Sequence, residues 1–187
     1  VHSPNRRITM SDRALYIYVD GSCEENRNVT SQTPAGWGFC VISGDSGIGR
    51  GGGDVILEKS GPVVTDGSAD GFLGAEVGSN NTAELSAIAH AMRWLLTEGG
   101  DKGVVVRGDS QYALRISSGE WRAKANKALA DSARSLWFEV SSLRSLRAEH
   151  VRAHRGHRWN ERADHLAYRA MQGEDALPLQ FWKPGAR

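Results

Sequence analysis

The first third of the chain alternates hydrophobic and polar positions in short runs, which is typical of strands. Leu15–Asp20 is rich in residues that favour strands, and Gly36–Ile42 places its large apolar side chains on one face. A glycine-rich turn leads into Val55–Lys59, which we expect to pair with the preceding strand as a hairpin. Residues 60–79 have little periodicity and predict an irregular insertion, with one short strand at Gly74–Val77.

The rest of the chain combines helical spacing with isolated apolar runs. Apolar residues recur every three or four positions over Thr82–Glu98 and predict a helix capped by Asn80 or Asn81. Val104–Asp109 is a short apolar strand of the kind found at the centre of a parallel sheet. The further predicted elements are a helix at Ser110–Ile116, a helix at about Asn126–Leu143, a strand at Arg147–Ala153 and a helix from Asn160 to about Met171.

The resulting order β-β-β-α-β-α-α-β-α determines the predicted fold class. Three antiparallel strands followed by alternating helices and parallel strands predict an α/β fold, with a mixed five-stranded sheet and helices packed on it. We expect one domain over residues 14–172, a flexible N-terminal tail over residues 1–13 and a C-terminal tail over residues 173–187. Functional residues of such sheets gather at the carboxyl ends of strands.

Composition narrows the classes of function. The 187 residues are 40% hydrophobic and 24% charged, which is ordinary for a globular protein. The apolar runs are too short to span a membrane, the N-terminal residues lack the apolar stretch of a signal peptide, and two cysteines give no disulfide framework. These features predict an intracellular protein of the cytoplasm, nucleus or nucleoid that is neither secreted nor membrane-bound.

Charge is distributed unevenly along the chain. Residues 1–100 contain 7 Lys and Arg against 12 Asp and Glu, a net charge of −5, whereas residues 101–187 contain 16 against 10, a net charge of +6. An acidic half joined to a basic half suits a polyanionic substrate held beside a cation. Ordinary surface charge is the alternative, and charge alone does not decide between them.

Four acidic residues, far apart in the chain, each lie within a short polar signature: Asp20 in VDGS, Glu84 in SNNTAEL, Asp109 in GDSQY and Asp164 in NERADHLA. A folded domain seldom gathers carboxylates without a cation, so their convergence would indicate a divalent metal site. Each residue also has an ordinary alternative role. These alternatives are a turn for Asp20, the helix dipole for Glu84, a helix N-cap for Asp109, and an ion pair with Arg162 or Arg169 for Asp164.

Other polar residues fit nucleic-acid chemistry. Ser79–Thr82 places four hydrogen-bonding side chains in a row, which could contact base edges and ribose hydroxyls in a minor groove. Trp121 has cationic neighbours including Lys124, an arrangement that suits a phosphate backbone, although Trp121 could instead pack in the core. His154 follows a strand in a glycine-containing loop and suits a mobile acid, base or phosphate contact.

Two further patterns carry less weight. His150, His154 and His157 could bind zinc, but neither a cysteine nor an HExxH pattern supports that reading. Residues 47–52 match GxGxxG, but a strand rather than the required helix follows, so we reject a dinucleotide site.

Taken together, these segments resemble type 1 ribonuclease H, the metal-dependent nuclease that cuts RNA in RNA–DNA hybrids. The matching segments, in order and at similar spacing, are VDGSC at 19–23, NNTAEL at 80–85, DSQY at 109–112 and HRGHRWNERADHLA at 154–167. The resemblance implies an RNase H-like fold, with residues 14–172 as the ribonuclease H domain. The loop after Cys23 and the stretch 43–78 are longer than in compact members, and the basic protrusion of some bacterial members is missing after Trp121.

The resemblance also implies roles for individual residues. Asp20, Glu84, Asp109 and Asp164 would be catalytic metal ligands, and His154 would assist turnover. The implied substrate-binding residues are Ser79, Asn80, Asn81, Gln111 and Asn160, to which the basic segment adds Trp121 and Lys124. The implied cofactor is Mg²⁺, as two ions for which Mn²⁺ can substitute.

The implied partner is an RNA–DNA hybrid, and the implied reaction is endonucleolytic hydrolysis of its RNA strand to 5′-phosphate and 3′-hydroxyl ends by a monomer. Two alternatives stay open. The chain could be a non-catalytic RNA- or hybrid-binding module, or another polynucleotidyl transferase of the same fold.

Overall fold

The structure is a computed structural model that describes residues 14–187, and the predicted N-terminal tail over residues 1–13 lies outside the described residues. Its sheet has the strand order β3-β2-β1-β4-β5. The first three strands are antiparallel, and β4 and β5 run parallel to β1, which confirms the predicted mixed sheet. The strands are β1 (Leu15–Cys23), β2 (Ala35–Ser43), β3 (Asp54–Pro62), β4 (Val104–Gly108) and β5 (Leu146–His150).

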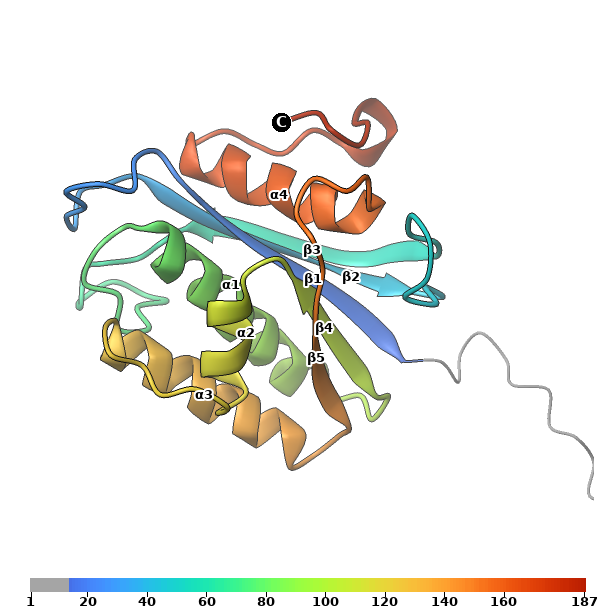
Figure 1. Cartoon of the computed structure of the whole chain (residues 1–187), viewed down its shortest axis with the longest axis horizontal. Helices are drawn as coiled ribbons and strands as arrows, with labels where there is room; N and C mark the ends of the chain where they lie inside the picture. Colours follow the sequence, from blue (N-terminus) through green and yellow to red (C-terminus); the bar gives the residue numbers. More distant parts are fainter. Residues whose placement is uncertain (1–13) are drawn as a thin grey trace, which may run out of the picture.

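Helices cover both faces of the sheet (Figure 1). α4 packs on β1, β2 and β3, whereas α1 packs on the other face of β1 and β2, with α2 and α3 against it. Within the described residues, none of the helices combines the length and the hydrophobicity needed to cross a membrane. The helices are α1 (Asn80–Glu98), α2 (Gln111–Ser117), α3 (Lys127–Ser141) and α4 (Arg158–Met171), with a 3-10 turn at Leu179–Phe181.

Strand alternation produces two hydrophobic cores, one on each face of the sheet. On β1, Ile17 and Val19 point into the core under α1, whereas Tyr16 and Tyr18 point into the smaller core under α4. All four side chains are at least nine-tenths buried. The central strand is therefore held on both faces, which makes it a rigid base for any residue at its end.

Two local predictions from the sequence are wrong. The strand predicted at Gly74–Val77 is irregular, because Gly74 has a left-handed backbone (φ 110°) and packs closely on α3. The N-cap of α1 is Ser79 rather than Asn80 or Asn81, and its hydroxyl accepts a hydrogen bond from the Thr82 amide at 3.1 Å.

The alternative role of Asp109 as a helix N-cap is wrong, and the start of α4 differs from the prediction. Ser110, and not Asp109, caps α2, because its hydroxyl accepts a hydrogen bond from the amide of Ala113 at 3.1 Å. α4 begins at Arg158, two residues before the predicted start, because His157 acts as its N-cap. Asp109 is thereby left with its carboxylate available for another role.

The segment 173–187, which has little pattern in the sequence, packs along α4 (Figure 1). The backbone amide of Leu177 donates to Nε2 of His165 at 3.0 Å. Trp182 is buried, and the Arg162 guanidinium lies 5.2 Å from its ring. The C-terminal residues are therefore fixed next to α4.

Candidate active site

Asp20 lies near the carboxyl end of β1 and is only 4% exposed. Its neighbour Gly21 has no room for a side chain, since a Cβ there would lie 2.5 Å from the backbone nitrogen of Glu84. This close approach of α1 to β1 brings Glu84 beside Asp20. The glycine of the VDGS signature thus allows the two candidate ligands, Asp20 and Glu84, to lie side by side.

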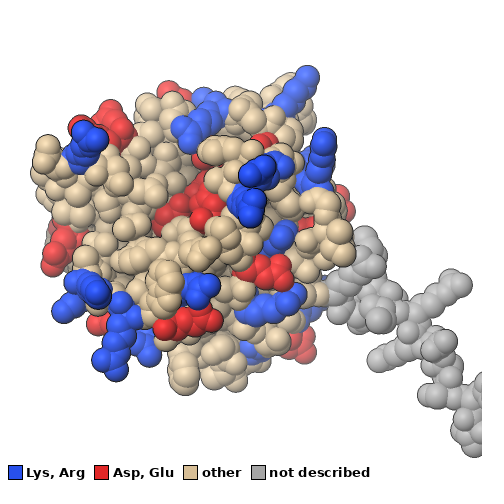
Figure 2. Space-filling model, viewed as in Figure 1, with Lys and Arg blue, Asp and Glu red and all other residues tan. Residues whose placement is uncertain are grey.

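Asp109 completes a cluster of three carboxylates. It follows β4 directly, and its strand lies next to β1 in the sheet. One oxygen from each of Asp20, Glu84 and Asp109 can be chosen so that all lie within 4.8 Å of one another. Figure 2 shows acidic side chains in a recess near the middle of one face, with Lys and Arg around it.

The three carboxylates strongly disfavour being charged together. Burial raises the pKa of Asp20 and of Glu84 well above the ordinary range, and the charge of Asp109 raises both further. The pKa of Asp109 is also raised, by burial first and then by the charge of Asp164. A divalent cation would relieve this repulsion.

The donor set fits a hard cation such as Mg²⁺, which binds carboxylate oxygens. Oε2 of Glu84 is buried and has no hydrogen-bond partner among the described residues. A buried oxygen without a hydrogen-bond partner destabilises the fold unless a bound ligand contacts it. The cluster therefore has both the chemistry and a free ligand atom for a metal ion.

Asp164, on α4, lies near this cluster but is not part of it. Its charge raises the pKa of both Asp20 and Asp109, although burial is the larger cause for each. The alternative ion pairs suggested for Asp164 are wrong, because Arg162 pairs with Glu58 and Arg169 pairs with Glu174. The partner of Asp164 is Arg187, 23 residues later in the chain.

His154 lies on the exposed loop before α4, in a left-handed backbone conformation (φ 54°). It lines a small pocket together with Asp164 and Arg187. The charge of His154 lowers the pKa of Asp109, so the loop that carries His154 lies near the carboxylates. The three histidines do not gather into a zinc site, because His150 contacts the Asp109 carbonyl at 3.1 Å and His157 lies in a separate network.

The proposed substrate-binding residues do not form one group. Ser79 is buried as a helix cap, and Asn160 is buried on α4 with Oδ1 lacking a partner among the described residues. The backbone amide of Asn80 donates to Oδ1 of Asn26 at 3.3 Å, so this asparagine of the long loop supports the start of α1. Gln111 is exposed on the first turn of α2.

Trp121 and Lys124 share a surface pocket with Asn81. The indole is 44% exposed, and the Arg115 guanidinium lies 5.1 Å from its ring. The alternative that Trp121 packs in the core is therefore wrong. An exposed aromatic ring among cations, in the same pocket as Asn81, provides a stacking surface next to positive charge.

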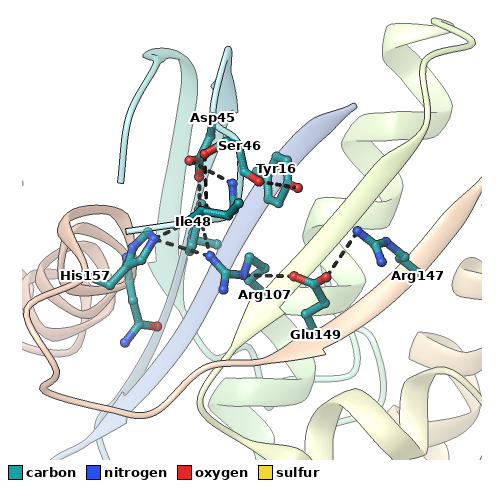
Figure 3. Close-up of polar contacts among 11 residues, drawn as sticks. Tyr16, Asp45, Ser46, Ile48, Arg107, Arg147, Glu149 and His157 are labelled. Carbon is teal, nitrogen blue, oxygen red and sulfur yellow. Dashed lines mark hydrogen bonds and ion pairs between the residues drawn. The ribbon is translucent and has the colours of Figure 1, made fainter. Parts of the chain in front are cut away.

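The sequence did not reveal a buried polar network under α4, part of which is seen in Figure 3. The Tyr18 hydroxyl donates to Asp45, which is 1% exposed, and accepts from Nη1 of Arg107 at 3.0 Å. Nε2 of His157 lies 3.2 Å from the same hydroxyl. Glu149 continues the network from β5, with its carboxylate 3.2 Å from Nε of Arg107. No local pattern connects these residues, which lie up to 139 positions apart.

The network fixes the first turn of α4. Nδ1 of His157 accepts from the amides of Trp159 and Asn160, so the neutral ring carries its proton on Nε2 and donates to Tyr18. The glycine-rich loop holds the same turn, since the Gly52 carbonyl accepts from Nε1 of Trp159 at 2.7 Å. The GxGxxG match at residues 47–52 is therefore part of a loop that packs against the start of α4.

We expect His157→Ala to lower the free energy of unfolding by about 1–2 kcal/mol at pH 7.5, through loss of the helix cap. Burial and then the charge of Arg107 lower the pKa of His157 from 6.5, with Asp45 opposing them. The folded state therefore favours neutral His157, and its contribution, complete above pH 6.5, is lost as the pH falls below that value.

Urea unfolding between pH 5 and 8 tests this expectation. His157→Asn is the matched control, because asparagine caps helices without titrating and should reduce the pH dependence. An alanine variant as stable as the wild type at pH 7.5 would contradict the capping role.

The topology and the carboxylate cluster define a class of protein, the α/β proteins of RNase H-like fold with a site made of hard oxygen ligands. The chain belongs to the RNase H family, whose family model matches residues 12–172. This confirms the resemblance seen in the four sequence segments.

Two curated relatives and two solved structures illustrate the match. The chain is 29% identical over 168 residues to a ribonuclease H of Thermosynechococcus vestitus, covering 84% of this chain and 89% of the relative. It is also 29% identical over 182 residues to a ribonuclease H of Anaplasma marginale, covering 91% and 99%.

Among solved structures, RNase H1 of the halophilic archaeon Halobacterium salinarum aligns with a TM-score of 0.60 at 25% identity, covering 86% of this chain and 98% of the other. LC11-RNase H1 in complex with an RNA/DNA hybrid shares the fold, with a TM-score of 0.60 at 24% identity, covering 85% and 97%.

Proposed function

We propose that this protein is an endonuclease that hydrolyses the RNA strand of RNA–DNA hybrids in a metal-dependent reaction, leaving 5′-phosphate and 3′-hydroxyl ends. The observation that carries the proposal is the cluster of Asp20, Glu84 and Asp109, with ligand oxygens within 4.8 Å, in a chain of the RNase H family. A structural relative of the same fold is bound to an RNA/DNA hybrid, which supports the choice of substrate.

Asp20, Glu84, Asp109 and Asp164 would hold the metal. Two bound Mg²⁺ ions, for which Mn²⁺ can substitute, would activate water and neutralise charge at the departing 3′ oxygen. Asp20 suits the central position, because β1 is packed on both faces and fixes its carboxylate. Glu84 would also accept a hydrogen bond from a ribose 2′-hydroxyl, a group that DNA lacks.

The hybrid would lie across the surface around the carboxylates. Asn80, Asn81 and Gln111 would contact its minor groove, where base edges and 2′-hydroxyls are accessible. Trp121 and Lys124 would contact the backbone from their shared pocket by stacking and charge.

We expect His154→Ala to lower kcat by about 10- to 100-fold while leaving measurable cleavage, because His154 would move a proton or help release product. Steady-state and single-turnover rates on a hybrid would separate product release from the chemical step. His154→Asn is the control for backbone strain, since asparagine tolerates the left-handed conformation. A kcat unchanged in both variants would make His154 an ordinary surface histidine.

A cleavage assay on three substrates tests the proposed function. With Mg²⁺, the protein should cut a hybrid and leave double-stranded DNA and double-stranded RNA intact. Preferential cutting of DNA would favour another polynucleotidyl transferase of this fold. Hybrid binding without cleavage of any substrate would favour a non-catalytic module.

A further inference from the structure

The C-terminal segment places a cation at the candidate active site. Trp182 anchors the segment in a buried position, and its indole N–H donates to the carbonyl of Ala186 at 3.0 Å. The amide of Ala186 in turn donates to the carbonyl of Lys183 at 3.0 Å. These contacts turn the chain back toward α4 and bring Arg187 to the active-site side of the helix.

Arg187 binds Asp164 through both carboxylate oxygens. Nε lies 3.1 Å from Oδ2, and Nη2 lies 3.1 Å from Oδ1, which is the forked geometry in which arginine binds carboxylates best. The guanidinium also lies 4.8 Å from the ring of Tyr168, which holds it over α4. The Asp164 side chain is only 19% exposed, so the pair is partly shielded from water.

This contact affects the one proposed ligand that stands outside the carboxylate cluster. The cluster within 4.8 Å contains Asp20, Glu84 and Asp109 but not Asp164. A guanidinium on both oxygens of Asp164 neutralises its charge and opposes the approach of a second cation. If Asp164 binds metal, Arg187 and the metal would compete for the same carboxylate.

We propose that Arg187 belongs to the active site, as a residue that holds Asp164 and competes with divalent metal for it. The inference rests on the proposed function, in which Asp164 is a metal ligand. Filling of the complete site then requires Arg187 to release Asp164, so the C-terminal segment raises the Mg²⁺ concentration at which the site is occupied.

Calorimetric titration of the metal-free protein with Mg²⁺ alone tests this inference without any substrate. Arg187→Ala should bind Mg²⁺ about 3- to 10-fold more tightly, the range expected from removing a partly exposed, forked ion pair. Arg187 is half exposed, so the substitution should leave the fold intact, which circular dichroism verifies.

Lys183→Ala is the matched control, because it removes an exposed cation from the same segment, and no bond from Lys183 to Asp164 occurs in the described structure. It should leave the Mg²⁺ dissociation constant close to that of the wild type. Equal tightening in both variants would reveal a general charge effect and overturn the inference.

Unchanged or weaker Mg²⁺ binding by Arg187→Ala would also overturn it. The proposed function is assessed separately by hybrid cleavage at saturating Mg²⁺. A wild-type protein that cuts hybrids, together with an Arg187→Ala variant of unchanged Mg²⁺ affinity, would reject the role of Arg187 alone.

Discussion

Asp20→Asn should reduce hybrid cleavage at saturating Mg²⁺ by at least about 1,000-fold, which corresponds to about 4 kcal/mol of lost transition-state stabilisation. An amide is close in size to a carboxylate but lacks the negative charge that binds the metal. Asp109→Asn should have a similar effect, because its oxygen belongs to the same cluster. The measurement is kcat on a hybrid over a range of Mg²⁺ concentrations.

The same substitution should stabilise the metal-free fold. Since the pKa of Asp20 is raised, by burial first and then by Asp109, the charged form is disfavoured in the folded state. The resulting cost is complete above the folded pKa, shrinks as the pH falls below it, and disappears only below the ordinary pKa of 3.8. At neutral pH the uncharged amide avoids this cost. The free energy of unfolding of Asp20→Asn, measured with urea in the presence of a chelator, should therefore be about 1–2 kcal/mol higher than that of the wild type.

Asp131→Asn on α3 is the control, because that aspartate is exposed. It should change neither cleavage nor the effect of Mg²⁺ on stability. Near-normal cleavage by Asp20→Asn would remove the metal assignment. Loss of cleavage with loss of helical signal would indicate unfolding, and Asp109→Asn would then decide the assignment.

Much of the fold can be predicted from the sequence, because the spacing of its hydrophobic residues is regular. The alternation in Leu15–Asp20 and the helical spacing in Thr82–Glu98 each correspond to an observed element. Element ends were less predictable, because several residues can perform the same cap. Ser79, Asn80 and Asn81 are all good caps, and only the reciprocal bond between Ser79 and Thr82 decides among them.

The candidate site was predictable where the ligands lie inside recognisable segments. The contacts that surround the ligands were not, because they depend on tertiary packing. Arg187 lies in a segment without periodicity, and its pairing with Asp164 depends on how Trp182 is buried. Asp45 lies in the turn after β2 and Arg107 on β4, and only the folded sheet brings them to Tyr18.

Hybrid binding should weaken about 100-fold when monovalent salt rises from 50 to 200 mM. Residues 101–187 carry a net charge of +6, and Arg122 and Lys124 lie in the surface pocket with Trp121. If this surface neutralises about four phosphates, the logarithm of the binding constant should fall by about 3.6 per tenfold rise in salt, because each contact releases bound counterions. Binding can be measured by fluorescence anisotropy with Asp20→Asn, which should bind the hybrid without cutting it.

The double substitution Arg122→Ala with Lys124→Ala, made in Asp20→Asn, should reduce that slope by about 1.8, because two phosphate contacts are lost. Arg93→Ala is the control, since this exposed cation on α1 lines a different pocket with Asp131. It should leave the slope unchanged. A binding constant insensitive to salt would exclude the basic half as the binding surface, since counterion release accompanies any neutralisation of phosphates. A steep slope reduced equally by Arg93→Ala would instead indicate that net charge, rather than the surface around Trp121, attracts the hybrid.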